Sequence, residues 1–227
     1  MRIGIIGSGN MGRTLGLLWA AAGHEVFFGA RNLEDAQAAA ARSSRSVGHG
    51  SNDEAASFGE VALWTVRDVN ASEVLNRPTA LDGKIVIDPN NGPLPADFTL
   101  GPGPGLLSHA ERLAVELPRA RVIKAFNTAA QEIFNHSPPT LRAHRVSAFL
   151  AGDDVGAKRV VAKLAEDMGL VPVDAGPLRA AGMLEGLGDF IRYMMGVDHR
   201  GPYTTISVEV LPAASSRFGG RTATRLK

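Results

Sequence analysis

The chain has 227 residues, no cysteine, and 24 Lys and Arg residues against 23 Asp and Glu residues. This balance excludes the strongly basic surface of a nucleic-acid-binding protein, and the lack of cysteine excludes disulfides, thiolate metal sites and a cysteine nucleophile. No apolar run reaches the ~20 residues needed to span a bilayer, and Met1 leads directly into a core strand instead of a signal peptide. We therefore expect a cytoplasmic protein with neither a membrane nor a nucleic-acid partner.

The first predicted elements are a strand, a glycine-rich turn and a helix. A buried-looking run at residues 3–6 stops at the letters GSGNMG, and a helical pattern starts directly after them. Gly7 allows the sharp turn out of the strand, Gly9 lets the backbone approach a pyrophosphate, and Gly12 lets the helix pack on the sheet. The N–H groups at the helix start then face the anion. With a strand before it and a helix after it, this motif predicts dinucleotide binding; a plain structural turn is the alternative.

The second predicted strand, residues 25–28, indicates which dinucleotide is bound. In an NAD site, a carboxylate about 20 residues beyond the glycines accepts hydrogen bonds from the ribose 2′-hydroxyl. Here the strand leads into Gly29, Ala30, Arg31 and Asn32, so the carboxylate is missing and a guanidinium is present. A planar, permanently charged fork suits a 2′-phosphate. The pattern predicts NADP(H), unless Arg31 is an ordinary solvated arginine at a helix start.

Strands and helices then alternate, which is the pattern of a parallel sheet covered on both faces. Further strands are predicted at residues 46–48, 61–65, 84–88 and 121–126, with helices at 33–42, 69–75 and 108–117. We therefore predict an α/β fold with a Rossmann-type, doubly wound parallel sheet. The carboxyl ends of such strands share one edge, where ligands bind. The expected cleft residues are Thr65, Val66, Arg67, Asn90, Asn91, Phe126 and Asn127.

The pattern breaks at residues 135–145, where Pro138 and Pro139 stand among polar residues. We place a boundary there, between an NADP-binding domain at 1–140 and a smaller α/β lobe at 141–227 that closes the cleft. The lobe is predicted to hold strands at 146–151 and 171–175 and a last helix at 178–195. That apolar helix is either a homodimer contact or part of the core. The basic segment 215–227 is interpreted as a mobile tail.

Four stretches together resemble one known family: GIIGSGNMG, FFGARN, HAERLAVELPRARVIKAFNT and AFLAGDDVGAKRVVAKLAEDMGLVPVDAGPLRAAGMLE. The chain resembles the NADPH-dependent reductases grouped with coenzyme F420-dependent NADP oxidoreductase, and it is similar to the cytosolic domain of the membrane metalloreductases. The likeness covers nearly the whole chain to about Met195. It implies NADP(H) on the first lobe, with a deazaflavin or flavin ring (coenzyme F420, FMN or FAD) against the nicotinamide in a cleft closed by the second lobe. Relatives are commonly dimers.

The resemblance also implies roles by position. It implies a diphosphate loop at Ser8, Gly9, Asn10 and Met11, a 2′-phosphate site at Arg31 and Asn32, a turn beside the cofactor at Thr65, Val66 and Arg67, and a segment near the nicotinamide at Ala125, Phe126 and Asn127. Deazaflavin enzymes of this family have a histidine in a Leu-His-Thr run where this chain has Phe126-Asn127-Thr128, and a proline in place of Val66. These departures concern the second cofactor and leave the NADP(H) half intact.

Hydride transfer between two stacked rings depends mainly on positioning. We assign no general acid or base, and give Asn127 either an orienting role toward the nicotinamide carboxamide or a structural role as a strand-end cap. The six histidines lack metal-ligand spacing, so no metal site is predicted. Three functions stay open: a reductase with a small-molecule deazaflavin or flavin acceptor, an NADPH dehydrogenase of a small imine or carbonyl resembling pyrroline-5-carboxylate reductase, and a non-catalytic NADP(H) sensor.

Overall fold

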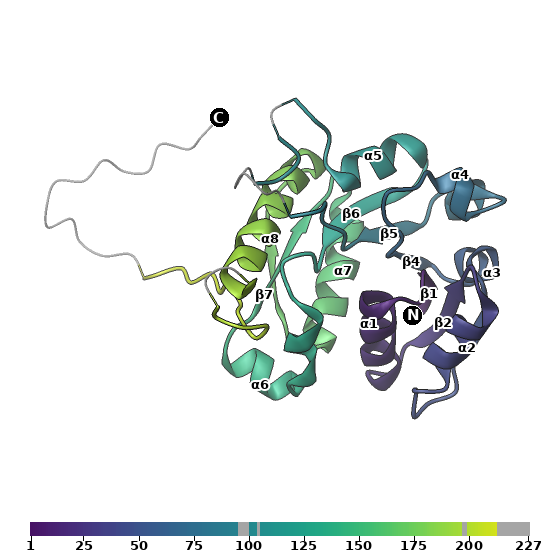
Figure 1. Cartoon of the computed structure of the whole chain (residues 1–227), viewed down its shortest axis with the longest axis horizontal. Coiled ribbons are helices and arrows are strands. Elements are labelled where there is room, and N and C mark those ends of the chain that lie inside the picture. The colour runs from purple at the N-terminus through teal and green to yellow at the C-terminus, as the bar shows by residue number, and fades with distance from the viewer. Residues whose placement is uncertain (95–99, 104, 197–198, 213–227) are drawn as a thin grey trace, which may run out of the picture.

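An eight-stranded sheet in the order β3-β2-β1-β4-β5-β6-β7-β8 runs through the computed structural model, which describes residues 1–94, 100–103, 105–196 and 199–212 (Figure 1). Its strands are β1 (Arg2–Ile6), β2 (Glu25–Ala30), β3 (Gly48–Ser51), β4 (Val61–Trp64), β5 (Ile85–Asp88), β6 (Arg121–Ala125), β7 (Ser147–Ala151) and β8 (Val171–Asp174). Every pairing is parallel except that of β6 with β7. The predicted α/β, Rossmann-type fold class is confirmed.

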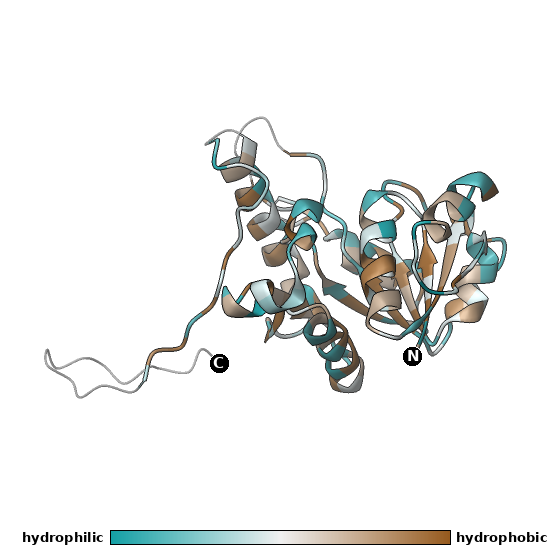
Figure 2. Cartoon of the chain, turned by 90° about the horizontal axis from the view of Figure 1, so that it is seen from below, coloured by the Kyte–Doolittle hydropathy of each residue, from teal (hydrophilic) through white to brown (hydrophobic). Residues whose placement is uncertain are grey.

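Helices cover both faces of this sheet. They are α1 (Asn10–Ala21), α2 (Leu33–Ala40), α3 (Asn52–Phe58), α4 (Ala71–Val74), α5 (His109–Glu116), α6 (Pro138–Ala143), α7 (Val155–Asp167) and α8 (Ala181–Gly196), with short 3₁₀ turns at 78–81, 131–135 and 178–180. Alternate strand residues point to opposite faces, so Ile5 joins one apolar cluster with α1 and α7, while Ile6 joins another with α3 and α5. Figure 2 shows this burial as mostly brown strands between helices that carry teal residues outward.

The region where the sequence pattern breaks contains two helical segments that the sequence analysis did not predict. Residues 131–135 form a 3₁₀ turn, and α6 begins at Pro138. A proline at the first helical position lacks only an N–H that has no partner there, so the two prolines start this helix instead of interrupting a pattern. The Ser137 side chain caps it by accepting from the N–H of Thr140. The short strand predicted at 46–48 lies two to three residues later in the structure, because β3 covers Gly48–Ser51.

The strands predicted for the smaller lobe, β7 and β8, extend the same sheet from β6. The division at residue 140 stays a prediction. The basic segment 215–227 lies outside the described residues. The order of strands reverses at β1, which has β2 on one side and β4 on the other. The carboxyl ends of β1 and β4 therefore form the switch point at which open α/β sheets bind ligands.

Candidate dinucleotide and acceptor site

The glycine turn between β1 and α1 leaves the start of the helix open. Gly9 is the N-cap residue of α1, where no side chain caps the helix and no acidic residue stands in the first turn. A Cβ atom on Gly9 would meet nothing within 4 Å, whereas one on Gly12 would collide with the Gly7 carbonyl and lie 2.9 Å from Thr65 Oγ1. Gly7 itself has a φ of 96°. The turn thus combines free N–H groups, a helix dipole and open space, which fits the diphosphate of a dinucleotide.

Side chains around the turn hold its main chain in place. The Gly7 N–H donates to Gly29 O at 3.1 Å and to Asn52 Oδ1 at 3.2 Å. Ser8 Oγ donates to the same Gly29 oxygen at 2.9 Å, and Thr65 Oγ1 donates to Gly7 O at 2.5 Å. The hydroxyls of Ser8 and Thr65 are therefore used inside the protein to fix the turn. Asn52 was not among the predicted site residues, and its only sequence signal was its place at the start of α3.

A first groove of about 870 Å³ leads from the glycine turn along the end of β2. Of the predicted site residues, Gly7, Ser8, Gly9, Ala30, Arg31, Val66 and Arg67 line it. Arg31 is exposed, so its guanidinium is available to a ligand in the groove. Asn32 does not line this groove: its side-chain oxygen accepts from the N–H of Glu34 and caps α2. Of these two residues, only Arg31 therefore lines the groove.

A second pocket of about 430 Å³ shares Gly9 and Arg67 with the first groove. The predicted residues Asn10, Met11, Thr65, Asn90, Asn91 and Asn127 line it. Helix α8 supplies part of the opposite wall through Gly188, Ile191, Arg192 and Met195, which the sequence analysis did not predict as site residues. The two cavities therefore adjoin at the glycine turn.

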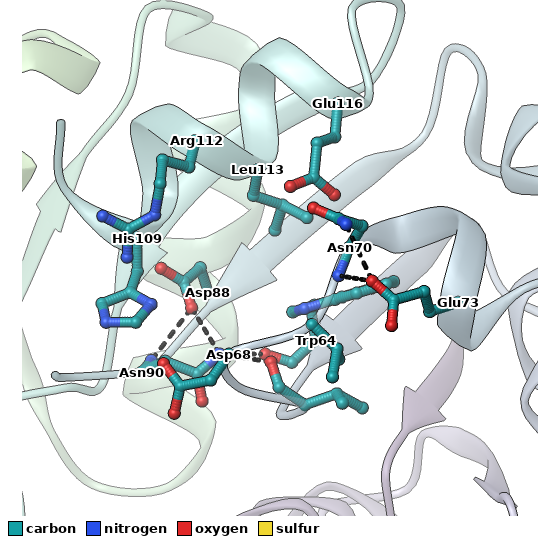
Figure 3. Close-up of a pocket in the computed structure, with 12 residues that line it drawn as sticks. Trp64, Asp68, Asn70, Glu73, Asp88, Asn90, His109, Arg112, Leu113 and Glu116 are labelled. Carbon is teal, nitrogen blue, oxygen red and sulfur yellow. Dashed lines mark hydrogen bonds between the residues drawn. The ribbon is translucent and has the colours of Figure 1, made fainter. Parts of the chain in front are cut away.

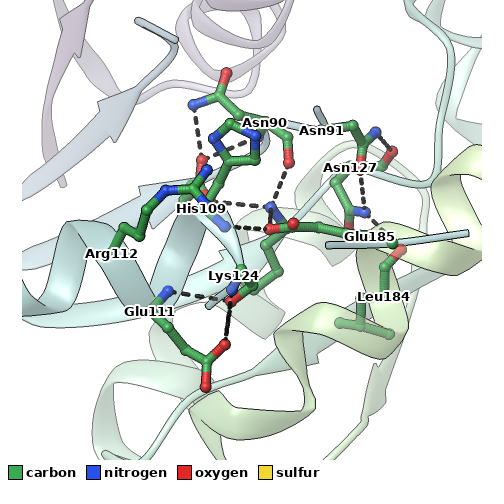
Figure 4. A network of polar contacts seen from close by, with 12 residues as sticks. Asn90, Asn91, His109, Glu111, Arg112, Lys124, Asn127, Leu184 and Glu185 are labelled. Atoms are coloured by element: carbon green, nitrogen blue, oxygen red, sulfur yellow. Dashed lines mark hydrogen bonds and ion pairs between the residues drawn. The ribbon is translucent and has the colours of Figure 1, made fainter. Parts of the chain in front are cut away.

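Two amides meet in this second pocket. Asn91 Nδ2 donates to Asn127 O at 2.7 Å, and Asn127 Nδ2 donates to Asn91 Oδ1 at 2.8 Å and to Leu184 O at 2.7 Å (Figure 4). Within the part of the chain that the structure describes, the buried Asn127 Oδ1 has no hydrogen-bond partner. A buried acceptor without a donor is costly, and a primary carboxamide such as that of nicotinamide can supply the donor.

Ala125 and Phe126 do not line the pockets found among the described residues, and both are buried in the core. Phe126 has a φ of 65° and packs edge-on against Trp19, with ring centroids 5.8 Å apart. A left-handed backbone at an aromatic residue is strained and persists only where its surroundings fix it. The packing of Phe126 therefore serves to direct the chain so that Asn127 reaches the pocket. Gly12 also has a packing role, because it lets α1 lie against the Gly7 carbonyl and Thr65.

A buried ion cluster lies behind the amides. Lys124 Nζ donates to Asp88 Oδ2 at 3.0 Å, to Glu185 Oε1 at 2.7 Å and to the Asn90 main-chain oxygen. Lys124 has no exposed surface, and Asp88 and Glu185 are 1% and 3% exposed. Neither Asp88 nor Lys124 was predicted to have a role in the site. Only the KAFNT motif drew attention to this position.

Beyond Asp88 lies a third, polar pocket of about 360 Å³, between the segment after β4 and helix α5 (Figure 3). Asn90 lines both this pocket and the second one, so the two adjoin. His109 lines it as well, and burial is the main cause that lowers the pKa of its imidazole. No group of three or more possible metal ligands occurs among the described residues. Nor, in the same residues, is any helix both long enough and apolar enough to cross a bilayer.

The fold, the glycine turn and the paired cavities define a dinucleotide-binding α/β protein. A family model described as NADP oxidoreductase, coenzyme F420-dependent, matches residues 2–92. The F420-dependent NADP reductase of Methanothermobacter marburgensis is 31% identical over 205 residues, covering 82% of this chain and 88% of that protein. The chain therefore belongs to the family of F420-dependent NADP reductases, which are NADP-dependent oxidoreductases.

Two further likenesses agree with this placement. Metalloreductase STEAP3 of Rattus norvegicus is 30% identical over 186 residues, which cover 82% of this chain and 36% of that protein. The chain thus spans about a third of the length of this metalloreductase. A crystal structure from Arthrobacter sp. FB24, described as an F420-dependent NADP-reductase, has a TM-score of 0.73 at 23% identity and covers 92% of this chain and 100% of that one. At that identity the likeness concerns the fold alone.

Proposed function

We propose that the protein transfers a hydride between NADP(H) and a deazaflavin or flavin-type ring. The observation that carries this proposal is the pair of adjoining cavities that share Gly9 and Arg67. The first has a glycine turn for a diphosphate and Arg31 for a 2′-phosphate. The second is bordered by amides and by α8. Family membership supports the same cofactor.

The residues of the site bind and orient. The open N–H groups of the turn hold the diphosphate, Arg31 recognises the 2′-phosphate, and Asn127 Oδ1 accepts from the carboxamide. NADP(H), when bound, supplies or takes up the hydride at nicotinamide C4. Helix α8, through Ile191 and Met195, excludes water from one side of the second pocket. Fixing two rings at near-attack distance accounts for most of the barrier reduction in such a reaction, so no protein acid is required.

The test is NADPH oxidation, followed at the nicotinamide absorbance band, with coenzyme F420, FMN, FAD or a ferric chelate as acceptor. We expect oxidation with at least one ring acceptor. Oxidation only with a small cyclic imine or carbonyl compound would contradict the proposal and indicate a dehydrogenase. NADPH binding without turnover of any acceptor would contradict it too and indicate a sensor.

The orienting role of Asn127 predicts a kinetic effect. Asn127→Ala should lower kcat about tenfold, because the carboxamide loses a buried hydrogen bond worth about 1–1.5 kcal/mol. Asn135→Ala is the matched control, since that asparagine is exposed on the 131–135 turn. An unchanged rate of hydride transfer in Asn127→Ala would leave only the structural role as a cap.

A homodimer through α8 is also part of this proposal. Met183 and Phe190 stand on one side of the helix, seven residues apart, and are 78% and 42% exposed. Exposed apolar side chains at this spacing support a helix contact between two copies. Light scattering after size-exclusion chromatography should give about twice the monomer mass, and Met183→Asp with Phe190→Asp should give the monomer mass. A wild-type monomer would contradict the dimer without affecting the proposed reaction.

A further inference from the structure

Lys124 joins three parts of the molecule beside the second pocket. Its ammonium group has three donors, and each finds an acceptor on a different element: Asp88 at the end of β5, Asn90 in the loop that follows, and Glu185 on α8 (Figure 4). The side chain is fully buried, so these bonds compete with no water. The lysine thus fixes the place of α8 on the sheet.

Stability alone is a poor explanation for such a cluster. Removing charged groups from water costs several kcal/mol each, and well-packed apolar residues often serve as well or better. Here two carboxylates face a single ammonium, with His109 and Arg112 as the nearby charged or titratable groups on α5. The arrangement is better explained by the geometry that it imposes on neighbouring groups.

That geometry concerns Asn127. Leu184 stands directly before Glu185, and its main-chain oxygen accepts from Asn127 Nδ2 at 2.7 Å. One turn later, a Cβ atom on Gly188 would lie 2.8 Å from Asn91 Nδ2 and 3.0 Å from Asn127 O. Only glycine lets α8 approach this amide pair so closely. A small shift of the helix would therefore break the bond that orients Asn127.

We propose that Lys124 and Glu185 are positioning residues: their buried bond holds α8 where Leu184 fixes the Asn127 amide and leaves Asn127 Oδ1 free for the nicotinamide carboxamide. The inference rests on the proposed function, because it assigns the second pocket to the nicotinamide and its acceptor. Neither residue lines either of the two cavities. Their effect reaches the reaction through Asn127 and through the wall that α8 provides.

The test compares Glu185→Leu with Glu185→Gln. The leucine variant loses the contact with Lys124 but keeps the balanced Lys124–Asp88 pair, while the glutamine oxygen can still accept from Lys124 and from the His109 N–H. Glu166→Leu, the same substitution at an exposed glutamate on α7, is the control. Three quantities are measured: the affinity for adenosine 2′,5′-bisphosphate, which occupies only the first groove, the affinity for NADPH, and kcat with the active acceptor.

We expect Glu185→Leu to lower kcat about tenfold or more, because misplacement of distant supporting groups is costly in rate. NADPH affinity should fall about threefold to tenfold, and affinity for adenosine 2′,5′-bisphosphate should stay within about twofold, since only the nicotinamide end is disturbed. Glu185→Gln should keep kcat within about threefold, because it retains the hydrogen bond. Should Glu185→Leu be insoluble, Gly188→Ala must give the same pattern, as its methyl group displaces α8 from the same amide pair.

An unchanged kcat in Glu185→Leu would overturn the inference. So would an equal loss of affinity for adenosine 2′,5′-bisphosphate and NADPH, which indicates general loosening, or a Glu185→Gln variant as slow as Glu185→Leu. If none of the tested acceptors lets the wild type oxidise NADPH, the proposed function fails. The affinities for adenosine 2′,5′-bisphosphate and for NADPH then still decide the role of Glu185.

Discussion

The two ends of the cofactor path are built in different ways. The turn at residues 7–12 offers main-chain N–H groups to a ligand, and its shape follows from glycines that lie close together in the sequence. The second pocket depends on side chains that come from β5, β6 and α8 and meet only in the folded protein. The first end is thus a local motif, and the second is a long-range network.

Because of this difference, we expect the first end to determine cofactor binding and the second end to determine which acceptor is used. A main-chain cradle tolerates change in the side chains around it, because its ligands are backbone groups. A side-chain network changes with any of its members, since each one positions the next. We therefore expect substitutions at the first end to alter NADP(H) affinity, and substitutions at the second end to alter turnover and stability.

The largest effect should come from breaking the network. Lys124→Met leaves Asp88 and Glu185 buried with no cation between them, which should lower the free energy of unfolding by about 3–5 kcal/mol. Adding Glu185→Gln to this variant should recover part of the loss, because one unpaired charge is removed. Urea unfolding measures both. A loss below about 1 kcal/mol for the single variant would show that the cluster is not the tightly coupled unit described above.

The glycine turn offers a matched pair of variants. Gly12→Ala should cost about 1–3 kcal/mol of stability and most of the NADPH affinity, since its methyl group collides with Gly7. Gly9→Ala should cost about 1 kcal/mol or less, because nothing lies within 4 Å of the new methyl group. That methyl group should still weaken NADPH binding, as it occupies the space of the diphosphate. Thermal unfolding and NADPH titration separate the two effects, and equal stability losses would contradict the packing described here.

The sequence alone predicted the local structure of the first end, but it did not predict the contacts of the second end. The strand, turn and helix around residues 7–12 are local, and the missing carboxylate after β2 pointed to Arg31. No local pattern pairs Lys124 with Glu185, because 61 positions separate them. The packing role of Phe126 was also out of reach, since it depends on a left-handed backbone. The cap role of Asn32 was within reach, because an asparagine directly before the helix predicted at 33–42 is a typical N-cap. The two prolines that start α6 were interpreted as a break in the pattern, because proline interrupts a helix when it stands in the helix interior.

Arg31 tests the recognition of NADP(H) at the first end. Arg31→Ala should narrow the difference in binding free energy between NADPH and NADH by about 1–3 kcal/mol, the range for charge-assisted hydrogen bonds to a phosphate. Arg13→Ala is a suitable control, because Arg13 lines the same groove but donates to Asn10 Oδ1. If the two variants changed the NADPH and NADH affinities alike, Arg31 would have no special role.

The smallest effect concerns pH. Burial is the main cause that lowers the pKa of His109 from 6.5, so the unfolded chain takes up a proton near pH 6.5 that the folded protein does not. Stability should therefore fall as the pH drops through this range, and His109→Asn should make the fall less steep. Urea midpoints at pH 7.5 and 5.5 measure the change. If the urea midpoint fell equally between pH 7.5 and 5.5 in the wild type and in His109→Asn, the lowered pKa of the half-buried His109 imidazole would be contradicted.

The central claim is that the groove from the glycine turn to Arg31 holds NADP(H). Isothermal titration calorimetry of the wild-type protein with NADPH and with NADH tests this claim most directly. We predict that NADPH binds at least about tenfold more tightly, equivalent to about 1.4 kcal/mol. Equal affinity for the two coenzymes, or no binding heat with either, would contradict it.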